Sequence, residues 1–317
     1  MRRWLRWIRA GMLARLGGVW WAKRRLRAEG AVVVVALHRV LEDADLERTN
    51  SLPGIILRRR TFEELAGHVA RSYSAVDLSG PIPRGPGARL RLALTFDDGW
   101  IDNYAAAFPI ARSHGIPITI FVCPGLAGRQ APFWPERIAA SIRKARPSAT
   151  SEEIEAVIER LKPCSPDAQR IAAAACTEDI DSTIAWEGIR RMASQGVAIG
   201  AHTQTHQILT TLPSGAARVE IRESKSAIEQ ALGSRCNLFA YPNGNHSAQT
   251  RALVAEAGFR LAFTVERGAW TAATDPFAIP RVNLSESDVA GPAGRFSPAM
   301  FDYAVVWKAW RASRPER

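Results

Sequence analysis

Short apolar runs alternate with segments of helical periodicity along most of the chain. The runs at 31–37 (AVVVVAL) and 116–122 (IPITIFV) are almost free of polar positions, which is typical of parallel strands buried on both faces. Further strands are predicted at 92–96, 197–200, 259–265 and 279–284. With the helical segments between them, these strands give roughly seven βα units and predict an α/β barrel.

One helical segment is well defined between residues 37 and 92. Its apolar residues recur at intervals of three and four, and they are Phe62, Leu65, Ala66, Val69 and Tyr73. The sequence Thr-Phe-Glu-Glu at 61–64 has the form of a capping box and predicts that the helix begins there. His68 falls off the apolar stripe, so we expect it to face solvent.

The chain divides into three parts on this pattern. Residues 1–30 form a basic, Trp-rich amphipathic segment, 31–290 form the barrel, and 291–317 form an amphipathic, aromatic and basic helix. The stretch 124–182 lacks strand character and is rich in Ala, Glu and Arg. We expect it to be a helical insertion near the mouth of the barrel, where it would help to shape the substrate site.

The net charge of +11 is concentrated at the amino terminus. Residues 1–30 hold nine Lys or Arg residues against one acid, Glu29, and so carry +8 of the total. Because the remainder is nearly balanced, the composition does not support a nucleic-acid partner.

Residues 1–30 also hold four of the ten tryptophans, and their apolar residues recur at helical spacing. The stripe consists of Trp4, Ile8, Met12, Leu16 and Val19/Trp20. Tryptophan combined with arginine on an amphipathic helix suits the headgroup layer of an anionic membrane. The alternative is a helix packed on the barrel through its tryptophans, with solvated arginines.

The predicted strand at 92–96 ends in two adjacent carboxylates, Asp97 and Asp98, followed by Gly99. Neighbouring residues of a strand point to opposite sides, so both carboxylates share one site only if the strand has begun to turn, which Gly99 permits. Two crowded carboxylates repel one another unless a cation lies between them. The arrangement therefore indicates a metal, although for a bare DDG tripeptide a strand end with an Asx turn is the better explanation.

Two imidazoles follow in the sequence HTQTH, at His202 and His206. On a helical turn this spacing presents both rings to the same side, as it does where two histidines bind one metal. Together with Asp98 they make a set of two histidines and one carboxylate that leaves coordination positions open. Zn²⁺ is the expected divalent ion, with Ni, Co or Fe as alternatives.

The complete TFDDG and H-T-x-x-H motifs, in this order, resemble the polysaccharide deacetylases of carbohydrate esterase family 4, the NodB homology domain. The resemblance implies a deformed (β/α)7 barrel with flanking amphipathic helices. It also implies a metal-dependent hydrolase that removes an N-acetyl group from an amino sugar of a polysaccharide, oligosaccharide or lipid-linked glycan. In this family Asp97 would be the general base, and Asp98, His202 and His206 would hold the metal.

The resemblance assigns the remaining roles to three further places. The oxyanion donor would belong to the segment FAYPNG at 239–244, with Tyr241 and Asn243 as candidates. Many family members carry an arginine after the phenylalanine of this segment, where it orients the catalytic aspartate. Here Ala240 stands in that place, and Arg281, in the last predicted strand, could replace the missing arginine.

His38 directly follows the run at 31–37, at the end of a strand where a barrel places catalytic groups. In the branch that includes the poly-N-acetylglucosamine deacetylases, the late histidine motif comes from an N-terminal strand by circular permutation. This chain resembles that branch, because no L-x-H-x-x-D motif follows residue 246. His38 is therefore the candidate acid for the leaving amine, and a hydrogen-bonded histidine at the barrel rim is the alternative.

Two other classes of function compete with the deacetylase. A non-catalytic, metal-containing carbohydrate-binding protein is disfavoured by Asp97, because binding alone needs no base. An Fe(II) oxygenase with two histidines and a carboxylate is disfavoured by the barrel pattern and by the second aspartate.

The amino terminus also bears on localisation. Arg9 and Arg15 interrupt any hydrophobic core of a signal peptide, and the four cysteines lack the spacing of a disulfide framework. These features predict a bacterial protein that is cytoplasmic and peripheral on the inner membrane.

Overall fold

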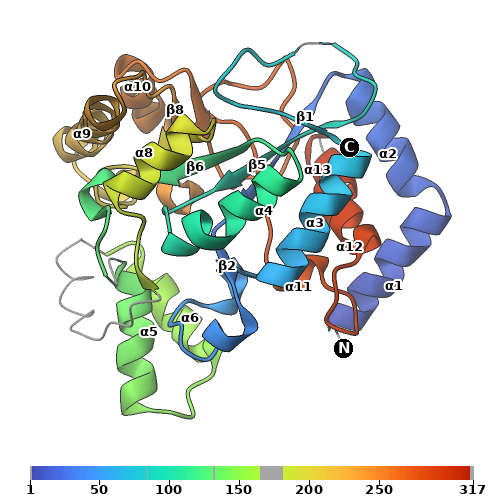
Figure 1. Ribbon diagram of the computed structural model, residues 1–317, viewed down its shortest axis with the longest axis horizontal. Coiled ribbons are helices and arrows are strands. Elements are labelled where there is room, and N and C mark those ends of the chain that lie inside the picture. The colour runs from blue at the N-terminus through green and yellow to red at the C-terminus, as the bar shows by residue number, and fades with distance from the viewer. Residues whose placement is uncertain (1, 84, 131–132, 165–180, 315–317) are drawn as a thin grey trace.

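The computed structural model describes residues 2–83, 85–130, 133–164 and 181–314. A curled sheet of parallel strands lies at its centre, and helices cover its outer face (Figure 1). This is the deformed (β/α)7 barrel expected from the sequence, and the predicted fold class is confirmed.

The central sheet has the strand order β10-β1-β5-β6-β7-β8-β9, and the two-residue β4 (Ser74–Ala75) pairs with β5. The other strands are β1 (Val32–Leu37), β5 (Arg91–Phe96), β6 (Ile118–Val122), β7 (Ala198–Ala201), β8 (Leu238–Ala240), β9 (Leu261–Phe263) and β10 (Val282–Asn283). A small second sheet pairs β2 (Arg39–Leu41) with β3 (Ile56–Arg58).

The segment 279–284, which contains β10, closes the barrel by lying between β9 and β1. On one side Ile279 forms a parallel bridge with Phe263 of β9, and on the other Val282 pairs with Val35 of β1. Pro280 has no N–H to donate, so the regular ladder is interrupted at the middle of this segment. The closure positions Arg281 on the same strand end as the catalytic candidates.

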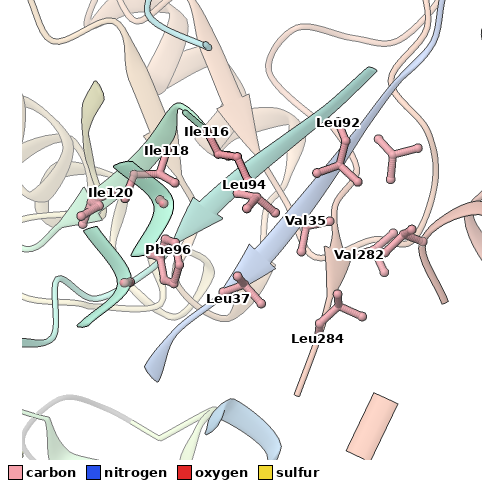
Figure 2. Close-up of a cluster of buried hydrophobic side chains, with 14 of the residues drawn as sticks. Val35, Leu37, Leu92, Leu94, Phe96, Ile116, Ile118, Ile120, Val282 and Leu284 are labelled. Carbon is pink, nitrogen blue, oxygen red and sulfur yellow. The ribbon is translucent and has the colours of Figure 1, made fainter. Parts of the chain in front are cut away.

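Alternate residues of each strand pack into two separate cores. The outward set packs beneath the helices, and Figure 2 shows Val35, Leu37, Leu92, Leu94 and Phe96 among its members. The inward set fills the ring and includes Val32, Val34, Ala93, Phe121 and Phe263. Because side chains alternate along a strand, Thr95 and Asp97 continue the inward set of β5 beyond Ala93.

Helices surround the sheet and extend to both termini. The helices that precede the barrel or lie in its first half are α1 (Arg2–Arg15), α2 (Gly18–Ala28), α3 (Arg59–Ser72), α4 (Phe108–Ser113), α5 (Trp134–Ala145) and α6 (Ser151–Leu161). The later helices are α8 (Trp186–Ser194), α9 (Ser214–Leu232), α10 (Ala248–Glu256), α11 (Glu286–Val289), α12 (Pro298–Asp302) and α13 (Lys308–Ala312). None of the described helices is long and apolar enough to cross a membrane.

Helix α3 confirms one sequence prediction and corrects two. Its apolar stripe is buried as expected, with Phe62 and Leu65 fully inaccessible. The capping box at 61–64 is wrong, because α3 begins at Arg59 and the Thr61 hydroxyl instead donates to Glu286 Oε1 at 2.8 Å. His68 does not face solvent either, since its Nε2 lies 2.9 Å from Asp302 Oδ1 and its ring packs edge-on against Phe301.

The N-terminal helices pack on the C-terminal ones through a face other than the predicted stripe. Ala10 of α1 is buried with Met300 and Tyr303, and Ala22 and Leu26 of α2 are buried in the main core. Within the predicted stripe, Val19 is buried, while Met12, Leu16 and Trp20 are exposed; the side chain of Trp4 lies outside the described residues.

Candidate metal and catalytic site

Asp97 and Asp98 stand at the carboxyl end of β5, where the backbone turns sharply. Asp98 has a φ of 72° and Gly99 a φ of 71°, so the strand ends in two successive left-handed residues. The turn predicted at Gly99 therefore begins one residue earlier. Because of this turn, both carboxylates line the same cleft despite being neighbours in sequence.

Left-handed backbone marks this end of the barrel. The described chain has four non-glycine residues with positive φ, namely Asp98, Thr203, His206 and Asn243. All four lie in the loops that follow β5, β7 and β8. Such conformations cost about 1–3 kcal/mol each and persist where the surrounding structure enforces them, commonly at functional sites.

His202 and His206 converge, but not on a helical turn as their spacing predicted. Thr203 and His206 each have a φ of 62°, which is incompatible with an α-helix. The loop is instead fixed to α9, because Glu220 accepts hydrogen bonds from the backbone N–H and the hydroxyl of Thr205 at 2.8 and 2.6 Å. Sequence spacing does not report the handedness of the backbone, which explains the error.

Three potential ligand atoms meet at one point above the barrel. Asp98 Oδ1 lies 3.5 Å from Nε2 of His202 and 3.2 Å from Nε2 of His206. Asp98 Oδ1 is buried, and its polar contacts here are with these two imidazoles. The three residues form a cluster able to hold a metal ion.

The separations of these atoms fit a bound cation. Ligand atoms at about 2.0–2.1 Å from a tetrahedral Zn²⁺ would lie about 3.3–3.4 Å apart. The distances of 3.2 and 3.5 Å lie on either side of that value. Burial raises the pKa of Asp98, but His206, His38 and His202 together outweigh this effect, so the pKa lies below its usual range and Asp98 is ionised.

Surrounding groups orient two of the three ligands. The Nδ1 atom of His202 lies 2.8 Å from the carbonyl oxygen of Ala240, and burial lowers the pKa of His202 to about 4. If Nδ1 carries the proton, the neutral ring presents its Nε2 lone pair to the site. The indole N–H of Trp100 donates to Asp98 Oδ2 at 2.9 Å, which leaves Oδ1 for the metal.

Asp97 forms a bidentate ion pair with Arg281, which is fully buried. The Nη1 and Nη2 atoms of Arg281 each donate to one carboxylate oxygen at 2.7 Å. Arg281 also donates to the Thr264 carbonyl at 2.8 Å and to the Thr95 hydroxyl at 3.1 Å. Burial raises the pKa of Asp97, but Arg281 and His202 more than compensate and hold it below its usual range.

His38 lies in the cleft, beyond the end of β1. Its Nδ1 is buried and has no hydrogen-bond partner among the described residues. Asn103 fixes its backbone, because the Asn103 amide donates to the His38 carbonyl at 2.6 Å. His38 also contributes to lowering the pKa values of Asp97 and Asp98, which places it near both carboxylates.

The two candidates in the segment 239–244 behave differently. Tyr241 uses both of its donors within the chain: its N–H donates to the Phe263 carbonyl at 3.0 Å and its hydroxyl to the Phe277 carbonyl at 3.0 Å, so its contact with a substrate stays a prediction. Asn243 does line the cleft, and its Oδ1 accepts a hydrogen bond from Lys162 Nζ at 2.7 Å.

Sequence reasoning missed a buried network beside the metal candidates. Arg39 pairs with Asp102 at 2.8 Å and with Asp181 at 2.6 Å, and its guanidinium lies 4.2 Å from the ring centre of Trp100. Arg39 thereby supports the tryptophan that orients Asp98. The only sequence signals were that Arg39 follows His38 and Trp100 follows the DDG motif.

Glu136 of α5 is a second missed residue. It lines the cleft, is 6% exposed, and accepts a hydrogen bond from the Ser51 hydroxyl at 3.1 Å. Burial, followed by repulsion from Asp98, raises the pKa of Glu136 to about 7. No motif identified it, because its burial depends on how α5 packs over the mouth.

The cleft has a volume of about 300 Å³. The strand-end candidates form its floor, and α5 and α6 supply part of its wall through residues such as Trp134, Ile158 and Lys162. These helices belong to the stretch 124–182 predicted to shape the substrate site; its residues 131–132 and 165–180 lie outside the described structure.

The fold and this gathering of polar groups at the strand ends define an α/β barrel with a candidate metal site at its mouth. Residues 84–262, more than half of the chain, match the family model for polysaccharide deacetylases, and the chain therefore belongs to the polysaccharide deacetylase family. The relationship to the NodB domain expected from the two motifs is confirmed. So is the class of enzyme, at the level of the family: a hydrolytic deacetylase.

Similar proteins agree with this assignment. YxkH of Bacillus subtilis, classed with the polysaccharide deacetylases, is 21% identical over 207 residues, which are 65% of this chain and 56% of its own length. The chain thus spans little more than half of that relative.

Two solved structures show the likeness in fold. PplD, a deacetylase of Streptococcus pyogenes solved with acetate, has a TM-score of 0.57 and 16% identity, covering 84% of this chain and 99% of its own. IcaB from Ammonifex degensii has a TM-score of 0.55 and 20% identity, covering 90% of this chain and 98% of its own.

Proposed function

We propose that this protein is a metal-dependent hydrolase that removes an N-acetyl group from an amino sugar of a glycan or glycolipid. The observation that carries the proposal is the pairing of Asp97 with Arg281 beside the cluster of Asp98, His202 and His206. A binding protein needs a metal site at most, whereas a hydrolase also needs an ionised base held next to it.

Asp98, His202 and His206 would hold the ion, most simply Zn²⁺. When bound, such an ion polarises an amide carbonyl and lowers the pKa of water towards neutrality. Asp97 then has the role of general base, and its depressed pKa keeps it ionised at neutral pH. In this proposal Arg281 fixes the orientation of Asp97 and takes the place of the family arginine that Ala240 replaces.

The leaving group is an amine, which departs only when it is protonated. His38 is the candidate acid, because it lines the cleft and is coupled to both aspartates. Asn243, held by Lys162 of the insertion, would contact the substrate at the opposite wall. The direct test is release of acetate, or formate, from a panel of free, lipid-linked and polymeric amino sugars.

Substituting any one of the three ligand candidates is expected to abolish metal binding and activity together. His202→Ala, His206→Ala and Asp98→Ala each remove one of three ligand atoms, and the remaining two hold a divalent ion poorly. Metal content after dialysis and acetate release would be measured side by side. His114→Ala, at the end of α4, is the matched control. Stoichiometric metal in all three variants would remove the proposed site.

His38→Ala is expected to lower the rate on unactivated amides by about 10²–10⁴-fold. The loss should be much smaller on an amide whose amine leaves without protonation, such as a nitroanilide. Rates on both substrates would be compared in the variant and in wild type. An equal loss on the two would show that His38 does not protonate the leaving group.

Association with an anionic membrane surface is a separate part of the proposal. It is supported by the nine basic residues of 1–30 and by the exposed apolar side chains of α1 and α2. It would bring the enzyme to lipid-linked or membrane-proximal glycans on the cytoplasmic face of a bacterial inner membrane. Fractionation of cells that express the full chain tests it.

A further inference from the structure

Helix α1 exposes an apolar stripe that nothing in the described chain covers. Leu5, Met12 and Leu16 are 57%, 52% and 82% exposed. At 100° per residue they fall within a narrow sector of the helix, whereas Ala10, which packs on the barrel, lies well away from it. The exposed residues Arg9 and Arg15 border the stripe on its two sides.

Helix α2, which follows directly, lines a basic hollow. Trp20, which is 63% exposed, forms one wall, and Lys23, Arg24 and Arg27 follow on the same face of the helix. The fourth basic residue, Arg89, comes from the loop before β5 and belongs to the barrel rather than to the N-terminal helices. The volume of the hollow is about 330 Å³.

The hollow concentrates positive charge without carboxylates in its wall. Its lining contains four basic residues, and no Asp or Glu is among the described residues that form it. Burial lowers the pKa of Lys23, Asp302 opposes this effect, and the nearby charge of Arg89 adds to it. Backbone carbonyls fix two of the basic side chains, since Arg27 donates to Ala88 at 3.1 Å and Arg89 to Ala70 at 3.2 Å.

We propose that this hollow binds the phosphate of an anionic phospholipid while the stripe of Leu5, Met12, Leu16 and Trp20 enters the surrounding headgroup layer. The inference rests on the proposed membrane association but is independent of the deacetylase chemistry. It adds a defined lipid site and assigns part of it to Arg89, outside the basic segment 1–30. Binding through α2 and the barrel together would fix the orientation of the catalytic domain on the membrane.

The apolar stripe favours a bilayer over a soluble phosphate as the occupant. A soluble anion would need only the basic hollow and would gain nothing from three exposed apolar side chains on the preceding helix. A bilayer supplies both a phosphate layer and an apolar layer, and the N-terminal helices offer a group for each: the basic hollow, lined in part by Trp20, and the exposed apolar stripe.

The test is binding of the full-length protein to vesicles of phosphatidylcholine with and without phosphatidylglycerol, measured by co-sedimentation. Arg89→Gln and Arg24→Gln are each expected to weaken binding to the anionic vesicles about fivefold. Leu16→Ser should weaken it about tenfold. The control is Arg222→Gln on α9, which lies on the other side of the molecule from α2 and should change little (Figure 1). Thermal unfolding of each variant verifies that it is folded.

Three outcomes would overturn the proposal. If Arg89→Gln and Arg24→Gln bind like Arg222→Gln, the hollow takes no lipid. The ligand is a soluble anion if inorganic phosphate raises the melting temperature of wild type but not of Arg24→Gln, and if neither Arg24→Gln nor Arg89→Gln changes binding to vesicles. If Leu16→Ser converts a dimer in solution to a monomer and leaves vesicle binding unchanged, the stripe is an interface with a second copy. Each result is independent of whether acetate release is observed.

Discussion

Asp97→Asn is expected to lower turnover by about 10²–10⁴-fold while the fold and the metal remain. Asparagine has the shape of aspartate but cannot accept the proton of the attacking water. Arg281 loses its buried counter-ion in this variant, which costs stability, but it keeps its hydrogen bonds to Thr264 and Thr95, and the asparagine side chain still offers it one acceptor. The measurement is the rate of acetate release at saturating substrate, together with metal content.

The control for this substitution is a second carboxylate with comparable partners but no place in the cleft. Asp302 serves, because it accepts hydrogen bonds from Tyr73 at 2.6 Å and contacts His68 at 2.9 Å, on the side of the barrel covered by α12. Asp302→Asn should reduce stability without reducing turnover. Near-normal turnover in Asp97→Asn with intact metal would mean that the base lies elsewhere, and Glu136 would then be the next residue to substitute.

The strands could be predicted from the sequence because a buried strand appears there as a short run of apolar residues. A strand covered on both faces, such as the run of valines in β1, consists almost entirely of apolar residues. Such a run can be recognised in the sequence without knowing which elements cover it. The segment at 279–284 was also predicted as a strand, although it contains Arg281 and Asn283 and Pro280 interrupts its ladder. The apolar stripe of α3 was equally clear.

What failed depended on tertiary contacts. Thr61 has the residue type of a helix cap but donates to Glu286, which lies 225 positions away in sequence. The spacing of His202 and His206 was read as helical, whereas left-handed backbone at Thr203 brings them together.

The candidate metal ligands could be predicted from sequence motifs, but the hydrogen bonds that orient them could not. Asp98 and its two histidines lie within short, recognisable sequences. The groups that orient them do not, because Trp100 acts through its indole N–H and Glu136 enters the cleft only through the packing of α5. Arg281 was a sequence candidate solely because Ala240 stands where many members of the family carry an arginine. Its bidentate geometry is visible only in three dimensions.

Arg281→Met is expected to destabilise the protein by about 3–5 kcal/mol and to reduce turnover as well. Methionine approximates the length of the arginine stem but leaves the Asp97 carboxylate buried without its counter-ion. The side chains of Arg281 and Asp97 are 0% and 3% exposed, so water cannot substitute for the lost partner. The free energy of unfolding would be measured by denaturant titration, in wild type and variant.

A second variant separates the buried charge from lost packing. Asp97→Asn combined with Arg281→Met removes both charges, and replacing both members of a buried pair is often close to neutral. The double variant should therefore recover much of the stability lost in Arg281→Met, while remaining inactive. If it is as unstable as the single variant, the destabilisation comes from packing and from the lost hydrogen bonds to Thr264 and Thr95.

The pH dependence of stability gives an independent measure of the same pair. In wild type the pKa of Asp97 is depressed in the folded state, so its contribution is present above the unfolded value of about 3.9 and is lost as the pH falls through the folded pKa. Without Arg281, burial should dominate and raise that pKa, and stability should then be lost as the pH rises through it. The difference between wild type and Arg281→Met should accordingly widen as the pH is raised from about 4 towards neutrality. A constant difference across this range would contradict the idea that Arg281 serves to keep Asp97 ionised.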